Sequence, residues 1–251
     1  MESRTPHEFG PAFLDWFRER TEATWSTYPA PSLEYFEERG VYGCDWQPGT
    51  RWLGGLAEEQ LAAVERAWAL RFPPDYRLFL KLLHAVDRPM TCRRGRTAAS
   101  KTPTLHDAPS FYNWLTEGDI LRDRYDALAA GLQFDVEENG LWRPAWGTRP
   151  ATAEARAQRV CALVDAAPRL IPVFSHRYLL AEPCRSGNPV FSIVQSDIII
   201  YGADLRTYFL AEFADLLGIT RGEVRRDVDD AIQAGFAAYA ATPFWGDLCA
   251  G

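Results

Sequence analysis

The chain lacks a long apolar run and an apolar leader segment. Its 251 residues contain no uninterrupted hydrophobic stretch of about 18 residues, so the sequence predicts no transmembrane helix. Residues 1–11 also lack the apolar segment that is typical of signal peptides. We therefore expect a cytoplasmic protein with no membrane association.

The sequence also lacks the short motifs that mark common catalytic and metal sites. It contains no HExxH, no GxSxG and no GxxxxGK[ST] phosphate-binding loop. The four histidines lie far apart, and the five cysteines form no CxxC pair. We therefore expect no metal site, no cofactor and no disulfide framework, and we interpret the cysteines as small buried hydrophobic residues.

What the chain does contain is a large apolar and aromatic fraction with an acidic balance. Hydrophobic residues make up 47% of the chain, and nine tryptophans are present, which indicates a substantial core. The formal net charge is −7. This charge argues against a general nucleic-acid binder and favours a protein whose partner is basic.

The second half of the chain carries the strongest secondary-structure pattern. β-branched and aromatic runs of strand length are followed by apolar residues at helical spacing. The pattern predicts a strand over 171–180, a hairpin turn at 185–188, strands at 190–194 and 198–201, and a helix over 205–217. Upstream, residues 52–84 predict two helices separated by Pro73 and Pro74. Further helices are predicted at 11–20, 151–166 and 224–241.

Two carboxylates stand out in a segment that we predict to be a hairpin, residues 131–142. Asp135 and Glu137 would share one strand face, before an Asn-Gly turn. Such a pair can carry out acid–base chemistry or hold a cation. The alternative, which we favour, is an ion pair with Arg177, or with His176 if that ring is charged.

A hydrolase built on Ser175, His176 and Asp197 is a second catalytic hypothesis. Adjacent strand residues point to opposite faces, so Ser175 and His176 would not pair without distortion. A related hypothesis places an enzyme at Asp135, Glu137, His176 and Asp197, and it requires those four side chains to converge in a pocket.

Two other features are open to more than one interpretation. Trp142 and Trp146 flank a proline in an irregular segment, and they are either exposed binding anchors or core residues. The basic segment 88–104 is either a loop that binds phosphate or an acidic partner, or a solvated loop.

Residues 52–84 resemble the opening of the SUKH superfamily, which comprises Smi/Knr-type cell-wall-synthesis regulators and bacterial toxin-immunity proteins. The residues that carry this resemblance are Trp52, Leu53, Gly55, Leu56, Leu61, Val64, Glu65, Phe72, Pro73, Pro74, Asp75, Tyr76, Arg77, Phe79 and Leu80. The family's usual Asn-Gly pair after the second helix is absent, and residues 84–87 stand in its place.

A bacterial subgroup of this family is similar further along the chain, so that the resemblance covers about residues 52–217. The matching positions are 112–115, 134–137, Trp142, Trp146, Gly147, Arg149, Pro150, 170–173, 176–178, 187–190, Ser196, Asp197 and 201–205. The resemblance implies an α+β fold, with helices around a mostly antiparallel sheet. It also implies a protein-binding module without a shared catalytic site.

From these observations we expect one globular unit in three parts. Residues 1–51 form an N-terminal extension packed on the core, 52–219 the SUKH-like domain, and 220–251 a C-terminal helix and tail. We expect a non-catalytic binding protein of the toxin-immunity type, whose partner is a basic toxin domain. The alternative is an intracellular regulatory scaffold with an endogenous partner. The candidate partner-binding residues are Asp135, Glu137, Trp142, Trp146, Arg149, His176 and Tyr178.

Overall fold

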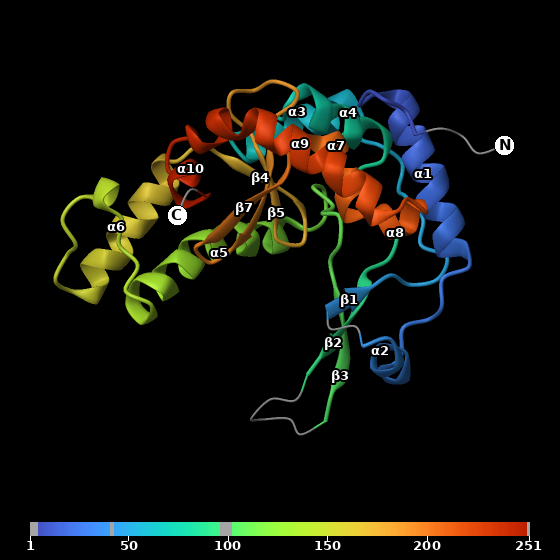
Figure 1. Cartoon of the computed structure of the whole chain (residues 1–251), viewed down its shortest axis with the longest axis horizontal. Coiled ribbons are helices and arrows are strands. Elements are labelled where there is room, and N and C mark those ends of the chain that lie inside the picture. The colour runs from blue at the N-terminus through green and yellow to red at the C-terminus, as the bar shows by residue number, and fades with distance from the viewer. Residues whose placement is uncertain (1–4, 41–42, 96–101, 250–251) are drawn as a thin grey trace.

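The computed structural model describes residues 5–40, 43–95 and 102–249, and it has an α+β fold (Figure 1). This confirms the predicted fold class: helices surround a four-stranded and a three-stranded antiparallel sheet. The strands are β1 (Gly43–Asp45), β2 (Met90–Arg94), β3 (Thr104–Ala108), β4 (Leu170–Phe174), β5 (Arg177–Leu180), β6 (Val190–Val194) and β7 (Asp197–Gly202). The helices are α1 (Pro11–Ser26), α2 (Leu33–Arg39), α3 (Glu58–Ala67), α4 (Pro74–Leu82), α5 (Gly118–Glu138), η1 (Pro144–Trp146), α6 (Ala153–Ala166), α7 (Leu205–Glu212), α8 (Ala214–Leu217), α9 (Arg221–Ala240) and α10 (Trp245–Cys249).

The central sheet contains β4, β5, β6 and β7 in chain order. The single strand predicted over 171–180 is wrong, because the chain reverses between β4 and β5. Ser175 adopts φ 50° in this turn, a left-handed conformation that is more usual for glycine, so the sequence does not mark the reversal. The strands predicted at 190–194 and 198–201 are confirmed as β6 and β7.

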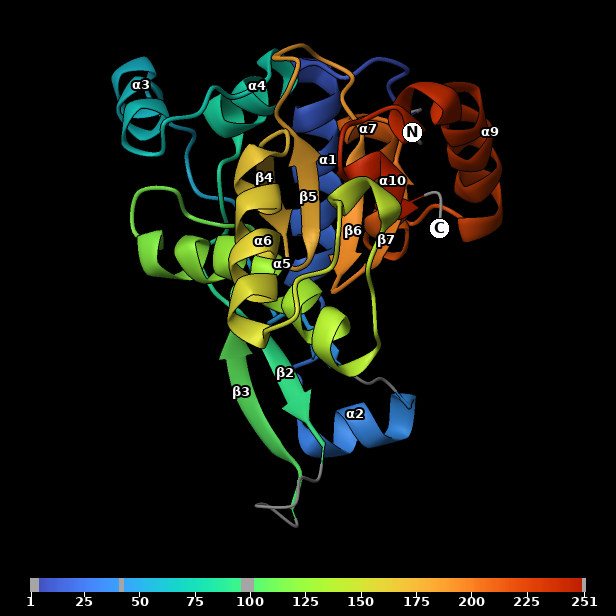
Figure 2. The same cartoon turned by 90° about the vertical axis from the view of Figure 1, so that its left-hand side faces the viewer.

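Both faces of the central sheet are buried against helices (Figure 2). Leu179 and Val190 face the larger apolar core, which also receives side chains from α1, α3, α4, α7 and α8. Tyr178 and Phe191 face a second core with α5, α6 and α10. The sheet therefore lies between two helical layers, with the β4–β5 and β6–β7 turns at one end and the β5–β6 connection at the other.

The hairpin predicted over 131–142 is wrong, since α5 continues through to Glu138. Leu121, Leu128, Leu132 and Val136 are buried along this helix at spacings of one or two turns. The Asn-Gly pair marks the end of the helix: Gly140 has φ 71°, and the Leu141 backbone N–H donates to the carbonyl of Asp135 (3.0 Å). The same dipeptide suits a hairpin turn and a helix terminus, and here the helical periodicity prevails.

The helices predicted between residues 52 and 84 are confirmed as α3 and α4. The predicted helix 151–166 is confirmed as α6, and the predicted helix 11–20 continues to Ser26 as α1. The predicted C-terminal helix is α9. The helix predicted over 205–217 is divided at Phe213 into α7 and α8.

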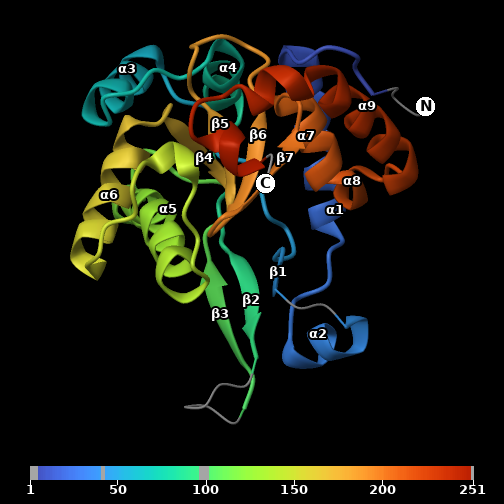
Figure 3. The same cartoon turned by 60° about the vertical axis from the view of Figure 1, so that its left-hand side comes forward.

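A three-stranded arm, which we define as β1, β2 and β3, extends away from the central sheet (Figure 3). The outer strand β3 exposes four of its five residues, so the arm buries little of its own surface. Of the basic segment 88–104, residues 90–94 lie in β2 and Thr104 begins β3. Arg93 forms an ion pair with Glu37 of α2 (3.1 Å), and Arg88 donates to the Pro48 carbonyl (2.8 Å). Arg96 and Lys101 lie outside the described residues.

A disulfide joins Cys44 of β1 to Cys92 of β2, contrary to the expectation that the cysteines are unpaired. The two cysteines are 48 residues apart in sequence, and they face each other only because β1 and β2 pair in that register. Spacing alone does not predict such a pairing. Cys161, Cys184 and Cys249 are free thiols.

The buried imidazole of His84 makes the stability of the fold depend on pH. His84 follows α4 with φ 63°, and its Nε2 accepts a hydrogen bond from the Trp114 backbone N–H (3.2 Å). Burial lowers the pKa of His84 from 6.5 to about 4. Between these values the unfolded chain binds a proton that the folded chain does not, so the free energy of unfolding falls as the pH drops.

We expect His84→Asn to reduce this pH dependence, because asparagine suits the left-handed backbone and does not titrate. Urea unfolding between pH 7.5 and pH 4.5 measures the effect. The wild type should lose about 2–3 kcal/mol more than the variant over this window. The exposed His106→Asn serves as control and should match the wild type. Identical slopes for wild type and His84→Asn would contradict the assignment.

Candidate functional site

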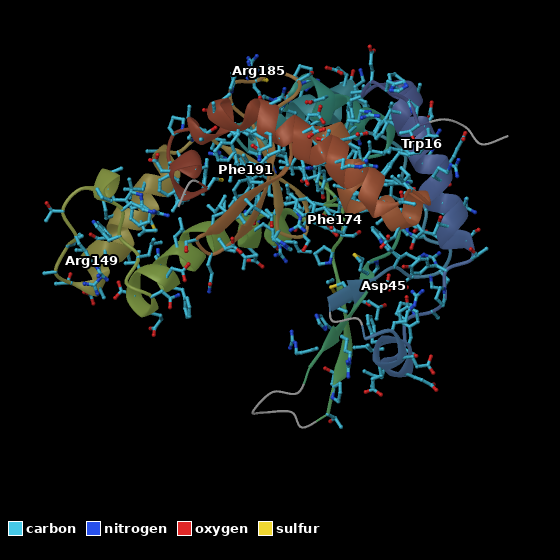
Figure 4. The ribbon with its side chains drawn as sticks, viewed as in Figure 1. Trp16, Asp45, Arg149, Phe174, Arg185 and Phe191 are labelled. Atoms are coloured by element: carbon cyan, nitrogen blue, oxygen red, sulfur yellow. A yellow bond between two sulfur atoms is a disulfide. The ribbon has the colours of Figure 1, made fainter. Side chains whose placement is uncertain are left out.

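A cleft of about 940 Å³ lies where the arm meets the body of the molecule. We call it the arm cleft, and its walls include Asp45, Trp46, Arg124, Ser175, His176 and Glu212. Figure 4 labels Asp45 on the arm side and Phe174 on the side of the body. These residues and Phe174 come from five separate parts of the chain: β1 with the residue after it, α5, the end of β4, the β4–β5 turn and the end of α7. Only the folded chain brings them together.

Aromatic side chains form the floor of the arm cleft. Trp46 and Phe174 are both buried, and their rings stack at 5.9 Å with an interplanar angle of 25°. Phe213 packs edge-on against Phe174 at 5.3 Å. The floor is therefore a rigid apolar surface that belongs to the larger core.

The arm side of the cleft is held by a hydrogen-bond network around Asp45. The Tyr35 hydroxyl donates to Oδ2 of Asp45 (2.6 Å), and the Trp46 backbone N–H donates to Oδ1 (2.8 Å). Arg39 Nη1 donates in turn to the Tyr35 hydroxyl (2.6 Å). Both carboxylate oxygens of Asp45 are thus engaged, which fixes the arm against α2.

The opposite side of the cleft is the β4–β5 turn, and its geometry corrects the expectation for Ser175 and His176. Both residues lie in the turn rather than in a strand, and Ser175 Oγ is 3.2 Å from His176 Nδ1. The Tyr112 hydroxyl donates to the Ser175 carbonyl (2.6 Å) and holds the left-handed residue in place. The two side chains therefore meet, although the sequence argument predicted that they would not.

Arg177 determines which of His176 and Ser175 donates the hydrogen bond between them. Its Nη1 contacts His176 Nε2, and a guanidinium can only donate, so Nε2 is the acceptor. The neutral ring then carries its proton on Nδ1, which donates to Ser175 Oγ. Burial and the charges of Arg177 and Arg124 lower the pKa of His176 to about 4, which keeps the ring neutral. In this tautomer His176 does not accept the proton of Ser175.

Arg177 is itself part of a buried network. Its Nε donates to Glu212 Oε2 (2.9 Å), and its Nη1 also donates to Ser192 Oγ (2.9 Å). The guanidinium lies 3.9 Å from the ring centroid of Tyr201. The ion pair predicted between Arg177 and Asp135 or Glu137 is therefore wrong, because those carboxylates lie on α5 rather than on a neighbouring strand.

Asp135 instead fixes the β6–β7 turn against α5. Its Oδ2 accepts hydrogen bonds from Ser196 N (2.8 Å) and Ser196 Oγ (2.5 Å), and its Oδ1 accepts from Asn139 (2.6 Å). Burial opposes ionisation, but these hydrogen bonds outweigh it and lower the pKa of Asp135. The stability that Asp135 contributes is therefore present above the pKa of the unfolded chain and lost as the pH falls through the lower folded pKa.

Glu137 forms an ion pair, but with Arg156 of α6. Arg156 Nε and Nη2 donate to the two carboxylate oxygens at 2.6 and 2.5 Å. This contact lowers the pKa of Glu137. Asp197 begins β7 opposite Val194 and lies in the other hairpin from His176. Within the described residues no contact joins the four side chains of the second enzyme hypothesis, and only His176 lines the arm cleft.

The remaining predicted site residues contact α5 or the segment that follows it. Trp146 is buried and stacks on Phe244, whereas Trp142 is half-buried, lies edge-on to Trp146 and donates to the Gly147 carbonyl (2.7 Å). Arg149 donates to the Val136 carbonyl (2.7 Å) and lies far from Asp45 in Figure 4. Tyr178 is also buried, and its hydroxyl donates to the Arg124 carbonyl (3.1 Å). Of the candidate partner-binding residues, only His176 lines the arm cleft.

We expect the two tryptophans to respond differently to replacement by alanine. Trp146→Ala removes a fully buried ring and should lower the free energy of unfolding by about 3–5 kcal/mol. Trp142→Ala removes a half-buried ring and should cost about 1 kcal/mol. Urea unfolding followed by circular dichroism measures both, and equal losses would show that the two rings do not differ in burial.

Sequence reasoning did not find Asp45, Trp46 or Arg124 as site residues. Each belongs to a different part of the chain, and no motif spacing connects them. A half-buried arginine in the middle of a helix also has no sequence signature.

Comparison of the chain with protein-family models, with curated proteins and with solved structures finds no match. Within the described ranges, no helix is long and apolar enough to cross a membrane. In the same part of the chain, no group of three or more His, Cys, Asp or Glu side chains is placed to hold a metal ion.

Proposed function

We propose that this protein is a non-catalytic protein-binding module of the toxin-immunity type, acting in the cytoplasm. The observation that carries this proposal is the arm, whose outer strand β3 exposes four of five residues on an element that buries little apolar surface. An open strand edge presents unpaired backbone groups, and partner proteins bind such edges by adding a strand. The arm therefore offers a ready contact surface.

The contacts of the candidate catalytic groups support the same proposal. Asp135 and Glu137 are engaged by Ser196 and Arg156, and the tautomer of His176 leaves Ser175 without a base. These side chains stabilise the hairpin turns and the helices around them. The resemblance to the SUKH superfamily points in the same direction.

The charge of the chain favours a basic partner. A net charge of −7 raises the rate of encounter with a positively charged toxin domain, and this attraction is screened by salt. A large multidomain toxin gene beside the gene for this chain would support the immunity function. An isolated gene would favour a regulatory scaffold.

Co-purification from the producing organism tests the proposal. The immobilised full chain should retain a basic protein at low salt and lose it at high salt. We expect Leu105→Asp, on β3, to abolish retention, and Ile199→Asp, at a more exposed position on β7, to preserve it. Failure to retain any protein, or equal loss with both variants, would overturn the proposal.

A further inference from the structure

Arg124 is an arginine in the wall of the arm cleft whose charge has no acidic partner. It is half-buried on α5, and no carboxylate of the described residues forms an ion pair with it. Its Nε is buried and has no hydrogen-bond partner within the described part of the chain. Arg124 also lines the arm cleft, so its guanidinium is placed to pair with an anionic group that enters the cleft.

The Ser175 hydroxyl provides a second donor on the same wall. Its oxygen accepts the Nδ1 proton of His176, because Arg177 occupies Nε2. The Ser175 O–H proton is therefore not used in that contact and remains available to a ligand. Ser175 has a left-handed backbone conformation, and the Tyr112 hydroxyl donates to its carbonyl, so the position of this donor is fixed.

Arg124 and Ser175 are neighbours through Tyr112. The Tyr112 hydroxyl donates to the Ser175 carbonyl (2.6 Å). Burial raises the pKa of Tyr112, and Arg124, which stands beside that hydroxyl, opposes the rise. Arg124 and Ser175 are therefore both neighbours of the Tyr112 hydroxyl.

The carboxylates in the cleft are already engaged with other groups. Asp45 accepts from Tyr35 and from the Trp46 backbone, and Glu212 accepts from Arg177. Asp215 also has a partner. Arg124, which has no acidic partner, therefore lines the same cleft as the rings of Trp46 and Phe174.

We propose that the arm cleft binds a small ligand that carries a carboxylate or phosphate on an aromatic body. The anionic group pairs with the Arg124 guanidinium and accepts a hydrogen bond from Ser175 Oγ, and the ring lies against the edges of Trp46 and Phe174 that line the cleft. A volume of about 940 Å³ falls within the range of small-molecule sites in proteins. This inference goes beyond the proposed protein-binding function and does not depend on it.

Isothermal titration of the purified full chain tests the inference with four probes: phenyl phosphate, benzoate, inorganic phosphate and benzylamine. We expect phenyl phosphate or benzoate to bind, and the tighter of the two distinguishes a phosphate from a carboxylate ligand. Inorganic phosphate should bind more weakly, because it lacks the ring, and benzylamine should not bind. Equal affinity for inorganic phosphate and phenyl phosphate would overturn the role of the aromatic floor.

Three variants assign the contacts. Arg124→Gln should weaken binding of the aromatic anion by about 10- to 100-fold, because a charge-assisted hydrogen bond is lost. Ser175→Gly keeps the left-handed turn, removes the hydroxyl and should weaken binding by about 2- to 10-fold. Arg122→Gln, an exposed position on the same helix that pairs with Asp119, should bind like the wild type.

Circular dichroism establishes that each variant is folded. Arg124→Gln should not disturb Tyr178, because the Tyr178 hydroxyl donates to the backbone carbonyl of residue 124, which the variant retains. Absence of binding by both aromatic anions would overturn the inference. So would an unchanged affinity in folded Arg124→Gln. Neither result bears on whether the arm retains a protein partner.

Discussion

Phe111→Ala is expected to lower the free energy of unfolding by about 3–5 kcal/mol. Phe111 is 3% exposed, and its ring centroid lies 4.7 Å from that of Trp52, 5.2 Å from Phe174 and 5.3 Å from Phe213. Its backbone also forms an isolated bridge with Phe174. Truncation opens a cavity where α4, α7 and the end of β4 meet, and rigid aromatic neighbours cannot collapse into it.

Urea unfolding followed by far-ultraviolet circular dichroism measures the loss for Phe111→Ala. Phe134→Ala is the matched control, because the same ring is removed at a position that is 50% exposed on α5. The control should change stability by about 0.5 kcal/mol or less. A loss below about 1 kcal/mol for Phe111→Ala would mean that Phe111 is not central to the aromatic core.

Gly55→Ala is expected to destabilise the protein by about 3 kcal/mol, whereas Gly54→Ala should leave stability within about 0.5 kcal/mol of the wild type. The chain at Gly55 runs along the end of α4: Leu53 N donates to the Ala85 carbonyl and Leu56 N to the Leu80 carbonyl, both at 2.8 Å. A Cβ at position 55 would overlap the Lys81 carbonyl, which is backbone and cannot swing away.

Thermal and urea unfolding of the two glycine variants provide the comparison. A Cβ at Gly54 meets no atom within 4 Å, so the pair differs in local space and not in chemistry. The expected difference arises entirely from the contact with α4. If both variants unfold at the same urea concentration, the segment does not lie against α4 as described.

Local patterns predicted the elements whose signals depend on a few neighbouring residues. The helices α3 and α4 follow from apolar spacing and the proline pair between them, and β6 and β7 follow from their β-branched runs. Each of these features is carried by residues that are adjacent in sequence. The α+β class was predicted from the resemblance of residues 52–217 to the SUKH superfamily.

The errors arose where one local signal fits two structures. The Asn-Gly pair after α5 suits a hairpin turn or a helix end, and only the burial of α5 against the second core decides between them. The turn at Ser175 has no glycine or proline, so nothing in residues 171–180 marks it. An error at each position moved Asp135, Glu137 and His176 onto the wrong elements.

The arm cleft was not predicted from the sequence, and the reason is different. Trp46, Arg124 and Ser175 meet because β1, α5 and the β4–β5 turn come together in the folded chain. The Cys44–Cys92 disulfide has the same origin, since it depends on the register of β1 against β2. Such tertiary juxtapositions are set by packing, and one sequence without relatives does not reveal them.

The bond between Cys44 and Cys92 closes a covalent ring of chain that includes α3 and α4. A pull on β1 is transmitted directly to β2, so the inner strand cannot peel from its neighbour while the bond is intact. Reduction opens the ring, and only the backbone hydrogen bonds between β1 and β2 then resist separation of the two strands. In a compartment that keeps thiols reduced, the arm would therefore yield to mechanical force more readily than in an oxidising one.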